Sequence, residues 1–133
     1  MCFYYIHMYT HVSPQLEESE ACLSKIAEDF GRIRLLYGVR FLIRPLFPLL
    51  QKFLEPGAMI AWSHFTLEED GSWGYPHPKT TKFILEFNEL ESLFGEKDGF
   101  EILVNKHIRD TDHGRPLQIF IARKKVIELL PCV

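Results

Sequence analysis

Hydrophobic positions along the first half of the chain recur with two different periods, and these periods predict the order of the elements. Residues 2–12 are dense in aromatic and β-branched side chains, which favours a strand. Residues 14–30 repeat apolar side chains at helical spacing and predict an amphipathic helix. An apolar run at 33–41 predicts a short buried strand. The segment 44–54 predicts a helix with its two prolines in the first turn, where a missing N–H costs little.

An almost continuous apolar run opens the second half of the chain. It covers residues 58–65 and is typical of a strand buried on both faces, which favours a parallel sheet. The polar, turn-rich segment 66–81 follows it. A loop of this length inside a compact domain is often functional, so we expect binding residues there.

A short helix and two strands complete the predicted elements. Asn88 is expected to cap the helix, and Gly95 is expected to end it. Strands are predicted over 100–107 and 117–122, and the short polar turn 110–116 between them requires an antiparallel hairpin. The order β-α-β-α-β, loop, α-β-β indicates an α/β sheet with right-handed crossovers.

Composition and charge narrow the class of protein. A length of 133 residues suits one domain, and 47% hydrophobic with 25% charged residues is ordinary for a globular chain. A general nucleic-acid binder typically carries an excess of basic residues, and the net charge of -3 shows no such excess, which argues against that class. No window reaches the roughly 20 apolar residues of a membrane span, so no membrane association is predicted.

The cysteines and the amino-terminal segment indicate the compartment. Cys2, Cys22 and Cys132 are odd in number and widely spaced, which favours reduced thiols over a disulfide framework or a zinc site. Residues 1–12 lack the basic region and the uninterrupted apolar run of a signal peptide. A cytoplasmic location is therefore predicted.

Several passages together carry a family resemblance. They are 41–48 (FLIRPLFP), 54–60 (LEPGAMI), 83–94 followed by 100–103, and 118–124. In this order and spacing, over roughly two-thirds of the chain, they resemble the C-terminal half of class I methyltransferases that use S-adenosylmethionine. The tellurite-resistance type and small uncharacterised members are the most similar.

The resemblance implies a fold and a division of the chain. The expected fold is an α/β, Rossmann-like three-layer sheet with a C-terminal antiparallel hairpin, incomplete relative to the full methyltransferase. Residues 1–38 are a lead segment unlike the family, 39–125 form the family-like half, and 126–133 are a tail. The implied reaction is methyl transfer from S-adenosylmethionine to an unknown small-molecule or protein acceptor.

One motif of the family is missing. Its cofactor site begins with a glycine-rich turn after the first strand, and the spacing of the glycines in this sequence builds no such turn. We therefore predict that the chain is inactive alone. A fragment, a truncated isoform, an error in the gene prediction and a degenerate relative all stay open.

The resemblance also assigns candidate binding residues. Val39, Arg40, Phe41 and Leu42 follow the family's fourth strand and border its cofactor, although Phe41 and Leu42 are also well explained as core residues.

Substrate-facing groups are expected at the end of the next strand and in the long loop. Ser63, His64 and Phe65 end the strand. His64 is a candidate general base, but many family members carry a Glu close to the place of Ser63, and a structural histidine is the favoured interpretation.

Aromatic residues of the loop form a further candidate group. Trp73, Tyr75 and His77 form either an aromatic lid over a substrate or a simple cover of the sheet, with equal weight.

A metal site is the third and least favoured possibility. Asp110, Asp112 and His113, with His107 or His77, offer ligand types for a hydrolase or metal enzyme. Their spacing does not demand convergence, so a polar hairpin turn is favoured and no metal is predicted.

A non-catalytic interaction module is the alternative to a methyltransferase role. Without the family's first strands, the strand at 33–41 has an unpaired edge, and such an edge invites pairing with another chain or a second copy. The strand and helix of residues 2–30 are the other candidates to cover it.

Overall fold

The computed structural model describes residues 33–40, 42 and 44–126, together with positions 21, 24, 25 and 28 of the lead segment. The strand predicted over residues 2–12, most of the lead helix, Phe41 and the end of the tail lie outside the described residues. The strands are β1 (Ile33–Val39), β2 (Leu54–Phe65), β3 (Phe100–Arg109) and β4 (Pro116–Lys124). The helices are α2 (Leu46–Phe53), α3 (Glu89–Leu93) and the 3-10 turns η1 (Thr81–Phe83) and η2 (Glu96–Asp98).

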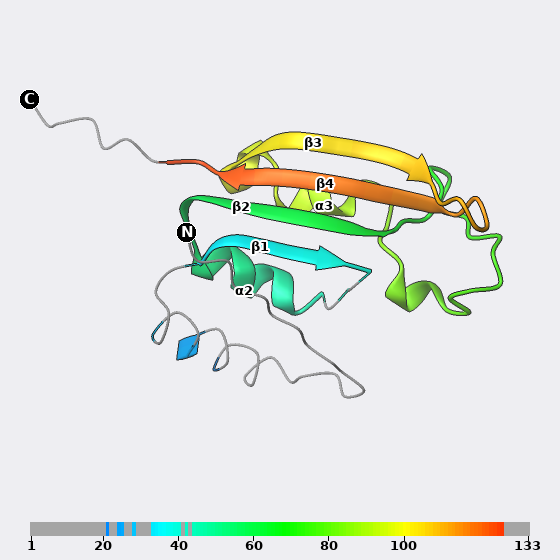
Figure 1. Ribbon diagram of the computed structural model, residues 1–133, viewed down its shortest axis with the longest axis horizontal. Coiled ribbons are helices and arrows are strands. Elements are labelled where there is room, and N and C mark those ends of the chain that lie inside the picture. Colours follow the sequence, from blue (N-terminus) through cyan, green and yellow to red (C-terminus); the bar gives the residue numbers. More distant parts are fainter. Residues whose placement is uncertain are drawn as a thin grey trace, which may run out of the picture.

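The four strands form one mixed sheet in the order β1-β2-β4-β3 (Figure 1). β1 runs parallel to β2, whereas β4 runs antiparallel to both β2 and β3. The predicted α/β fold and C-terminal hairpin are therefore confirmed. The parallel prediction for 58–65 holds only on one side of β2, because β4 pairs antiparallel on the other side.

Among the described residues, a hydrophobic core lies between the sheet and the helices α2 and α3. Phe47 of α2 is 1% exposed and makes edge-on ring contacts with Trp62 of β2 at 5.5 Å and with Phe94 at 5.7 Å. Phe94 in turn contacts Phe100 at 5.3 Å. The described helices thus bury their apolar sides on a single face of the sheet.

A glycine allows β1 to lie close to this core. A Cβ atom on Gly38 would stand 2.5 Å from the Trp62 ring, which is closer than carbon atoms can approach. Gly38 also pairs with Trp62 in the parallel register. The absence of a side chain at this position therefore lets the indole fill the space against β1.

Local sequence features explain where α2 begins and what stabilises its carboxyl end. Pro45 is the N-cap of α2 and Pro48 lies in its first turn, as predicted. Lys124 Nζ donates to the carbonyl oxygens of Gln51 and Leu54 at 2.8 and 2.9 Å, which places a cation at the carboxyl end of this helix, the position that the helix dipole favours.

The side-chain cap predicted for α3 is wrong. Asn88 adopts a left-handed backbone with φ of 62° and makes no capping hydrogen bond. Instead the carboxylate of Glu89 accepts a hydrogen bond from the Glu86 backbone N–H at 2.8 Å. The asparagine therefore turns the chain, a role its tolerance of the left-handed region allows.

The second strand begins earlier than predicted. β2 starts at Leu54, which pairs with Ile33, so that Pro56 and Gly57 lie inside the strand instead of ending α2. Both residues are exposed, and Gly57 has a φ of 86°. No described helix is long and apolar enough to cross a membrane.

Candidate functional site

The carboxyl ends of the parallel strands β1 and β2 lie side by side and define the candidate site. Val39 pairs with Ser63, and the Arg40 backbone N–H donates to the Ser63 carbonyl oxygen at 2.7 Å. Arg40 has a left-handed backbone with φ of 53°, which is uncommon for a residue other than glycine. In α/β sheets this edge is where ligands bind.

The Phe65 side chain is the centre of an aromatic and cationic cluster at this edge. The Arg40 guanidinium lies 5.0 Å from the centre of the Phe65 ring, and the Arg115 guanidinium lies 4.2 Å from it. The Trp73 ring follows at 6.2 Å, and Tyr75 contacts Trp73 at 4.9 Å. The sequence-predicted residues Arg40, Phe65, Trp73 and Tyr75 are thus brought together.

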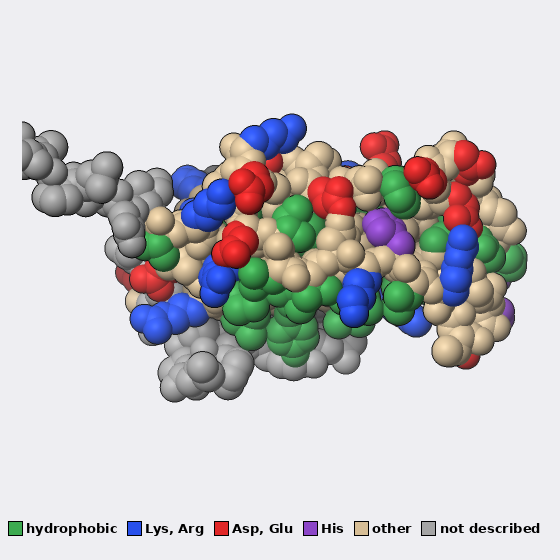
Figure 2. All heavy atoms as spheres, turned by 90° about the horizontal axis from the view of Figure 1, so that it is seen from above, with side chains coloured by type: hydrophobic (Ala, Val, Ile, Leu, Met, Phe, Trp, Pro, Cys, Tyr) green, Lys and Arg blue, Asp and Glu red, His purple; other side chains and the backbone are tan. Residues whose placement is uncertain are grey.

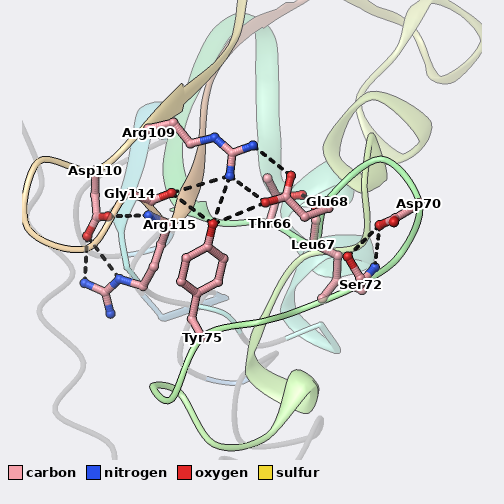
Figure 3. Close-up of polar contacts among 10 residues, drawn as sticks. All are labelled: Thr66, Leu67, Glu68, Asp70, Ser72, Tyr75, Arg109, Asp110, Gly114 and Arg115. Atoms are coloured by element: carbon pink, nitrogen blue, oxygen red, sulfur yellow. Dashed lines mark hydrogen bonds and ion pairs between the residues drawn. The ribbon is translucent and has the colours of Figure 1, made fainter.

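A hydrogen-bonded clasp fixes the long loop to the hairpin between β3 and β4 (Figure 3). Arg109 binds both carboxylate oxygens of Glu68, at 2.5 and 2.9 Å. The Tyr75 hydroxyl accepts from Arg109 at 3.2 Å and lies 3.1 Å from the Gly114 carbonyl oxygen. The hydrogen bond from Arg109 lowers the pKa of Glu68. The loop that carries Trp73 and Tyr75 is therefore held at a defined place.

A second ion pair shapes the hairpin turn. Asp110 accepts two hydrogen bonds from the Arg115 guanidinium, at 2.8 and 3.0 Å, and a third from its backbone N–H. These bonds lower the pKa of Asp110. The Asp110 carboxylate thus stabilises the hairpin turn and holds Arg115, whose guanidinium lies over the Phe65 ring. Among the described residues no group of three His, Cys, Asp or Glu side chains converges on a metal position.

Arg44 fastens the segment before α3 to the same edge. Its Nε and Nη2 donate to the two oxygens of Glu89 at 2.6 and 2.9 Å. Its terminal nitrogens also donate to the carbonyl oxygens of Lys82 and Ile84, at 2.8 and 2.7 Å. The hydrogen bond with Glu89 raises the pKa of Arg44.

His64 is buried beside this network, with 5% of its surface exposed. Its Nδ1 lies 3.2 Å from the Phe65 carbonyl oxygen. Burial lowers the pKa of His64, and the positive charges of Arg44 and Arg40 lower it further, against the hydrogen bond to Phe65 and the charge of Glu89. The imidazole is therefore neutral at pH 7. Its burial agrees with the structural interpretation favoured from sequence.

Two further predicted residues stand apart from the cluster. His77 is exposed and contributes only its carbonyl oxygen, which accepts from Arg115 at 3.3 Å. Leu42 is partly buried and packs against the core. The Trp73 indole N–H donates to the Pro78 carbonyl oxygen at 3.1 Å, which links the aromatic residues to the end of their own loop.

The residues that sequence analysis missed are the charged partners. Glu68 and Arg109 hold the clasp and Arg115 holds Asp110 in the hairpin turn, yet none of these three was a candidate. Glu68 and Arg109 are 41 positions apart, so no local pattern announces their pairing. Only the prediction of the hairpin, which turns Arg109 and Arg115 back toward the loop, offered an indirect signal.

Comparisons with solved structures establish the class of fold. The chain has a class I methyltransferase-like fold over about 74% of its length. It matches TehB from Haemophilus influenzae with a TM-score of 0.51 and 17% identity, covering 74% of this chain and 38% of that one. It matches the [4+2]-cyclase SpnF with a TM-score of 0.53 and 17% identity, covering 72% of this chain and 51% of that one.

The chain thus spans between about two-fifths and one-half of the length of these structures. No protein-family profile and no curated protein sequence matches it. The similarity concerns the fold.

The described residues do not supply the glycine-rich turn with which this fold approaches its cofactor. A cofactor approaches a glycine backbone at the end of a parallel strand. Gly38 is the glycine nearest to the end of β1, and the Trp62 ring fills the space beside it. The other described glycines lie in loops, in the hairpin turn or near the start of β2: Gly57, Gly71, Gly74, Gly95, Gly99 and Gly114.

Proposed function

We propose that the chain provides the acceptor-facing part of a methyl-transfer site and is inactive as a methyltransferase alone. The observation that carries this proposal is the cluster of Arg40, Phe65 and Trp73 at the carboxyl edge of a methyltransferase-like sheet. The sequence lacks the glycine-rich turn with which such a fold holds S-adenosylmethionine. The part of this chain is then to bind and orient an acceptor.

The proposed role agrees with what methyl transfer requires. Bound S-adenosylmethionine supplies an already activated methyl group, so alignment in a dry site matters more than a catalytic nucleophile. The half-buried Trp73 ring supplies an apolar surface and packs near the buried Phe65 ring, and the clasp of Glu68 and Arg109 holds the loop that carries Trp73 in place.

Calorimetric titration of S-adenosylhomocysteine into the purified chain tests the first half of the proposal. We expect no saturable binding by folded protein, because the sequence has no glycine-rich turn to hold the ligand. Saturable one-to-one binding would overturn the predicted inactivity. A search for an acceptor would then follow.

A chimera tests the second half. The part of TehB that this chain does not match is joined ahead of the full chain, and the same TehB part alone serves as the control. We expect the chimera to bind S-adenosylhomocysteine more tightly than the control, because the two parts then share one site. A folded chimera that binds no better than the control would contradict the methyltransferase role.

Pairing through β1 is a second candidate function, and we propose a second copy of this chain as the partner. Within the described residues, β1 pairs with β2 alone. A two-fold antiparallel pairing centred on Leu36 places Arg34 of each copy opposite Gly38 of the other, so like charges do not meet.

Matched lysine substitutions on the two outer strands test this pairing. Val39→Lys adds a charge to β1 at a side chain that is 64% exposed, and Leu103→Lys does the same on β3 at one that is 40% exposed. Sedimentation over a wide concentration range should show a dimer that Val39→Lys alone weakens. A wild-type chain that stays monomeric throughout would exclude the pairing.

A further inference from the structure

Among the four arginines at the candidate site, Arg40 differs from the others in its charge partner. Arg44, Arg109 and Arg115 each bind a carboxylate, of Glu89, Glu68 and Asp110 respectively. Within the described part of the chain no carboxylate pairs with Arg40, whose guanidinium instead lies over the Phe65 ring at 5.0 Å. Among the described residues, no carboxylate therefore neutralises the charge of Arg40, whereas one neutralises the charge of each of the other three arginines.

The Phe65 ring and the local backbone hold the Arg40 side chain at this place. The guanidinium carbon lies over the Phe65 ring, 5.0 Å from its centre, within the reach of a cation–π contact. The backbone hydrogen bond to Ser63 at 2.7 Å and the left-handed φ of 53° fix the residue from which this side chain extends. An unusual backbone of this kind often marks a binding position.

Arg40 lies at the edge of the sheet where α/β folds bind their ligands. It follows β1 directly, at the carboxyl edge of the only parallel strand pair among the described residues. The aromatic residues of the loop reach the same place through Phe65 and Trp73. A ligand at this edge therefore meets the half-buried Trp73 ring together with the exposed side chain of Arg40, whereas Phe65 lies buried beneath them.

We propose that Arg40 binds a carboxylate group of the methyl acceptor. The planar fork of a guanidinium matches the two oxygens of a carboxylate in a bidentate pair, which fixes orientation as well as charge. This inference rests on the proposed function for the identity of the acceptor. The acceptor class that follows is an organic acid with an apolar body.

Benzoate and its neutral analogue benzamide are the probes that test the site. Nuclear magnetic resonance of the full, isotope-labelled chain follows the Arg40 Nε–H signal during each titration. We expect benzoate to shift this signal in a saturable manner and benzamide to leave it unchanged, because only benzoate carries the charge. Equal effects of the two probes would overturn the proposal.

Three variants separate a fork-specific site from general attraction to a cation. In calorimetric titrations, which do not need the Arg40 signal, Arg40→Gln should weaken benzoate binding by about tenfold, and Arg40→Lys by about threefold, because lysine keeps the charge but loses the bidentate geometry. Arg34→Gln is the control, since Arg34 lies on β1, the strand that Arg40 follows, and its 85% exposed side chain pairs with Glu55 at 3.5 Å, away from the carboxyl end of the strand. An equal loss in Arg34→Gln, or no loss in Arg40→Gln, would contradict the assignment.

A last arm distinguishes the acceptor from the cofactor as the source of the carboxylate. S-adenosylhomocysteine carries a carboxylate and 5′-methylthioadenosine lacks it, so the two are titrated against the same Arg40 signal. We expect neither to shift it, and a shift by S-adenosylhomocysteine alone would overturn the acceptor assignment. Benzoate binding at Arg40 beside an unsuccessful chimera would instead disprove the proposed function and leave the carboxylate site standing.

Discussion

The two outer strands of the sheet, β1 and β3, are built differently although each pairs with only one neighbour among the described residues. β1 buries Ile33, Leu36 and Gly38 against the core. β3 buries only Phe100 and is otherwise half-buried or exposed. β1 thus has the inner face of an interior strand, whereas β3 has the character of an exterior one.

The hydrogen-bonding edges differ in the same sense. β3 contains a bulge between Ile102 and Val104 and carries Lys106, and both features discourage pairing with another strand. Figure 2, seen from the β3 side, shows acidic and basic side chains distributed around exposed hydrophobic ones. In β1 the only charged side chain is Arg34. The register shift in the pairing of β1 with β2 is confined to the start of the strand. The fold therefore protects one edge and leaves the other suited to a neighbour.

The largest expected effect separates the inner faces of the two strands. Leu36→Ala on β1 removes a side chain that is 7% exposed and should lower the free energy of unfolding by about 3 kcal/mol. Ile102→Ala on β3 is the control, because this side chain is 36% exposed and its truncation should cost at most about 1 kcal/mol. Urea denaturation measures both, and equal losses would remove the distinction between the strands.

A smaller effect tests how closely β1 approaches the core. Gly38→Ala forces a carbon against the Trp62 ring and should destabilise the fold by about 2 kcal/mol, since an overfilled core must shift. Gly74→Ala meets no atom within 4 Å and should change stability by less than about 0.5 kcal/mol. The contact is refuted if urea denaturation gives the two variants the same midpoint.

The pH dependence of stability compares two histidines on either side of Gln118. His64 of β2 and His107 of β3 both pair with Gln118 in register, but only His64 is buried. Because burial lowers the pKa of His64 in the folded state, the unfolded chain takes up the proton first, near pH 6.5. Stability should be constant above about pH 7 and fall toward pH 5, by no more than about 1.4 kcal/mol per pH unit.

Substitution identifies the source of this slope. His64→Gln should abolish the fall of the free energy of unfolding with pH, measured by urea denaturation between pH 5 and 7.5, whereas His107→Gln should leave that fall in place. The pKa values of Glu68 and Asp110 are lowered by their arginines, so their contribution is lost only below about pH 4.5 and does not overlap this window. A slope that survives in His64→Gln would assign it elsewhere.

The sequence predicted those parts of the fold that local chemistry determines. Prolines at the start of α2 and the polar turn between β3 and β4 limit the conformations of their own segments, so both elements were found. The start of β2 was misplaced because Pro56 and Gly57 end most elements, yet here pairing between Leu54 and Ile33 extends the strand through them. Tertiary pairing outweighed a local signal.

The candidate site divides in the same way. Arg40 and Phe65 were candidates because each follows or ends a predicted strand, and Trp73 because it lies in the long loop, and the structure places the three near one another. The clasp of Glu68 and Arg109 was not predicted, because a charged side chain is expected to be solvated unless the fold brings a partner near it. Such pairs add little stability at an exposed position, but they fix where the aromatic residues lie.

The smallest effect concerns the protection of β3. Lys106→Val removes a charge from this edge and gives it the apolar character of β1, so weak association should appear only at the highest concentrations. The bulge between Ile102 and Val104 remains, and because it breaks the alternation of side chains it should keep the association weaker than any pairing through β1. Sedimentation of Lys106→Val beside Lys97→Val, which changes an exposed lysine outside the strand, measures the difference. If Lys106→Val associated as strongly as the wild-type edge of β1, the bulge would offer no protection, and the contrast between the two edges would rest on charge alone.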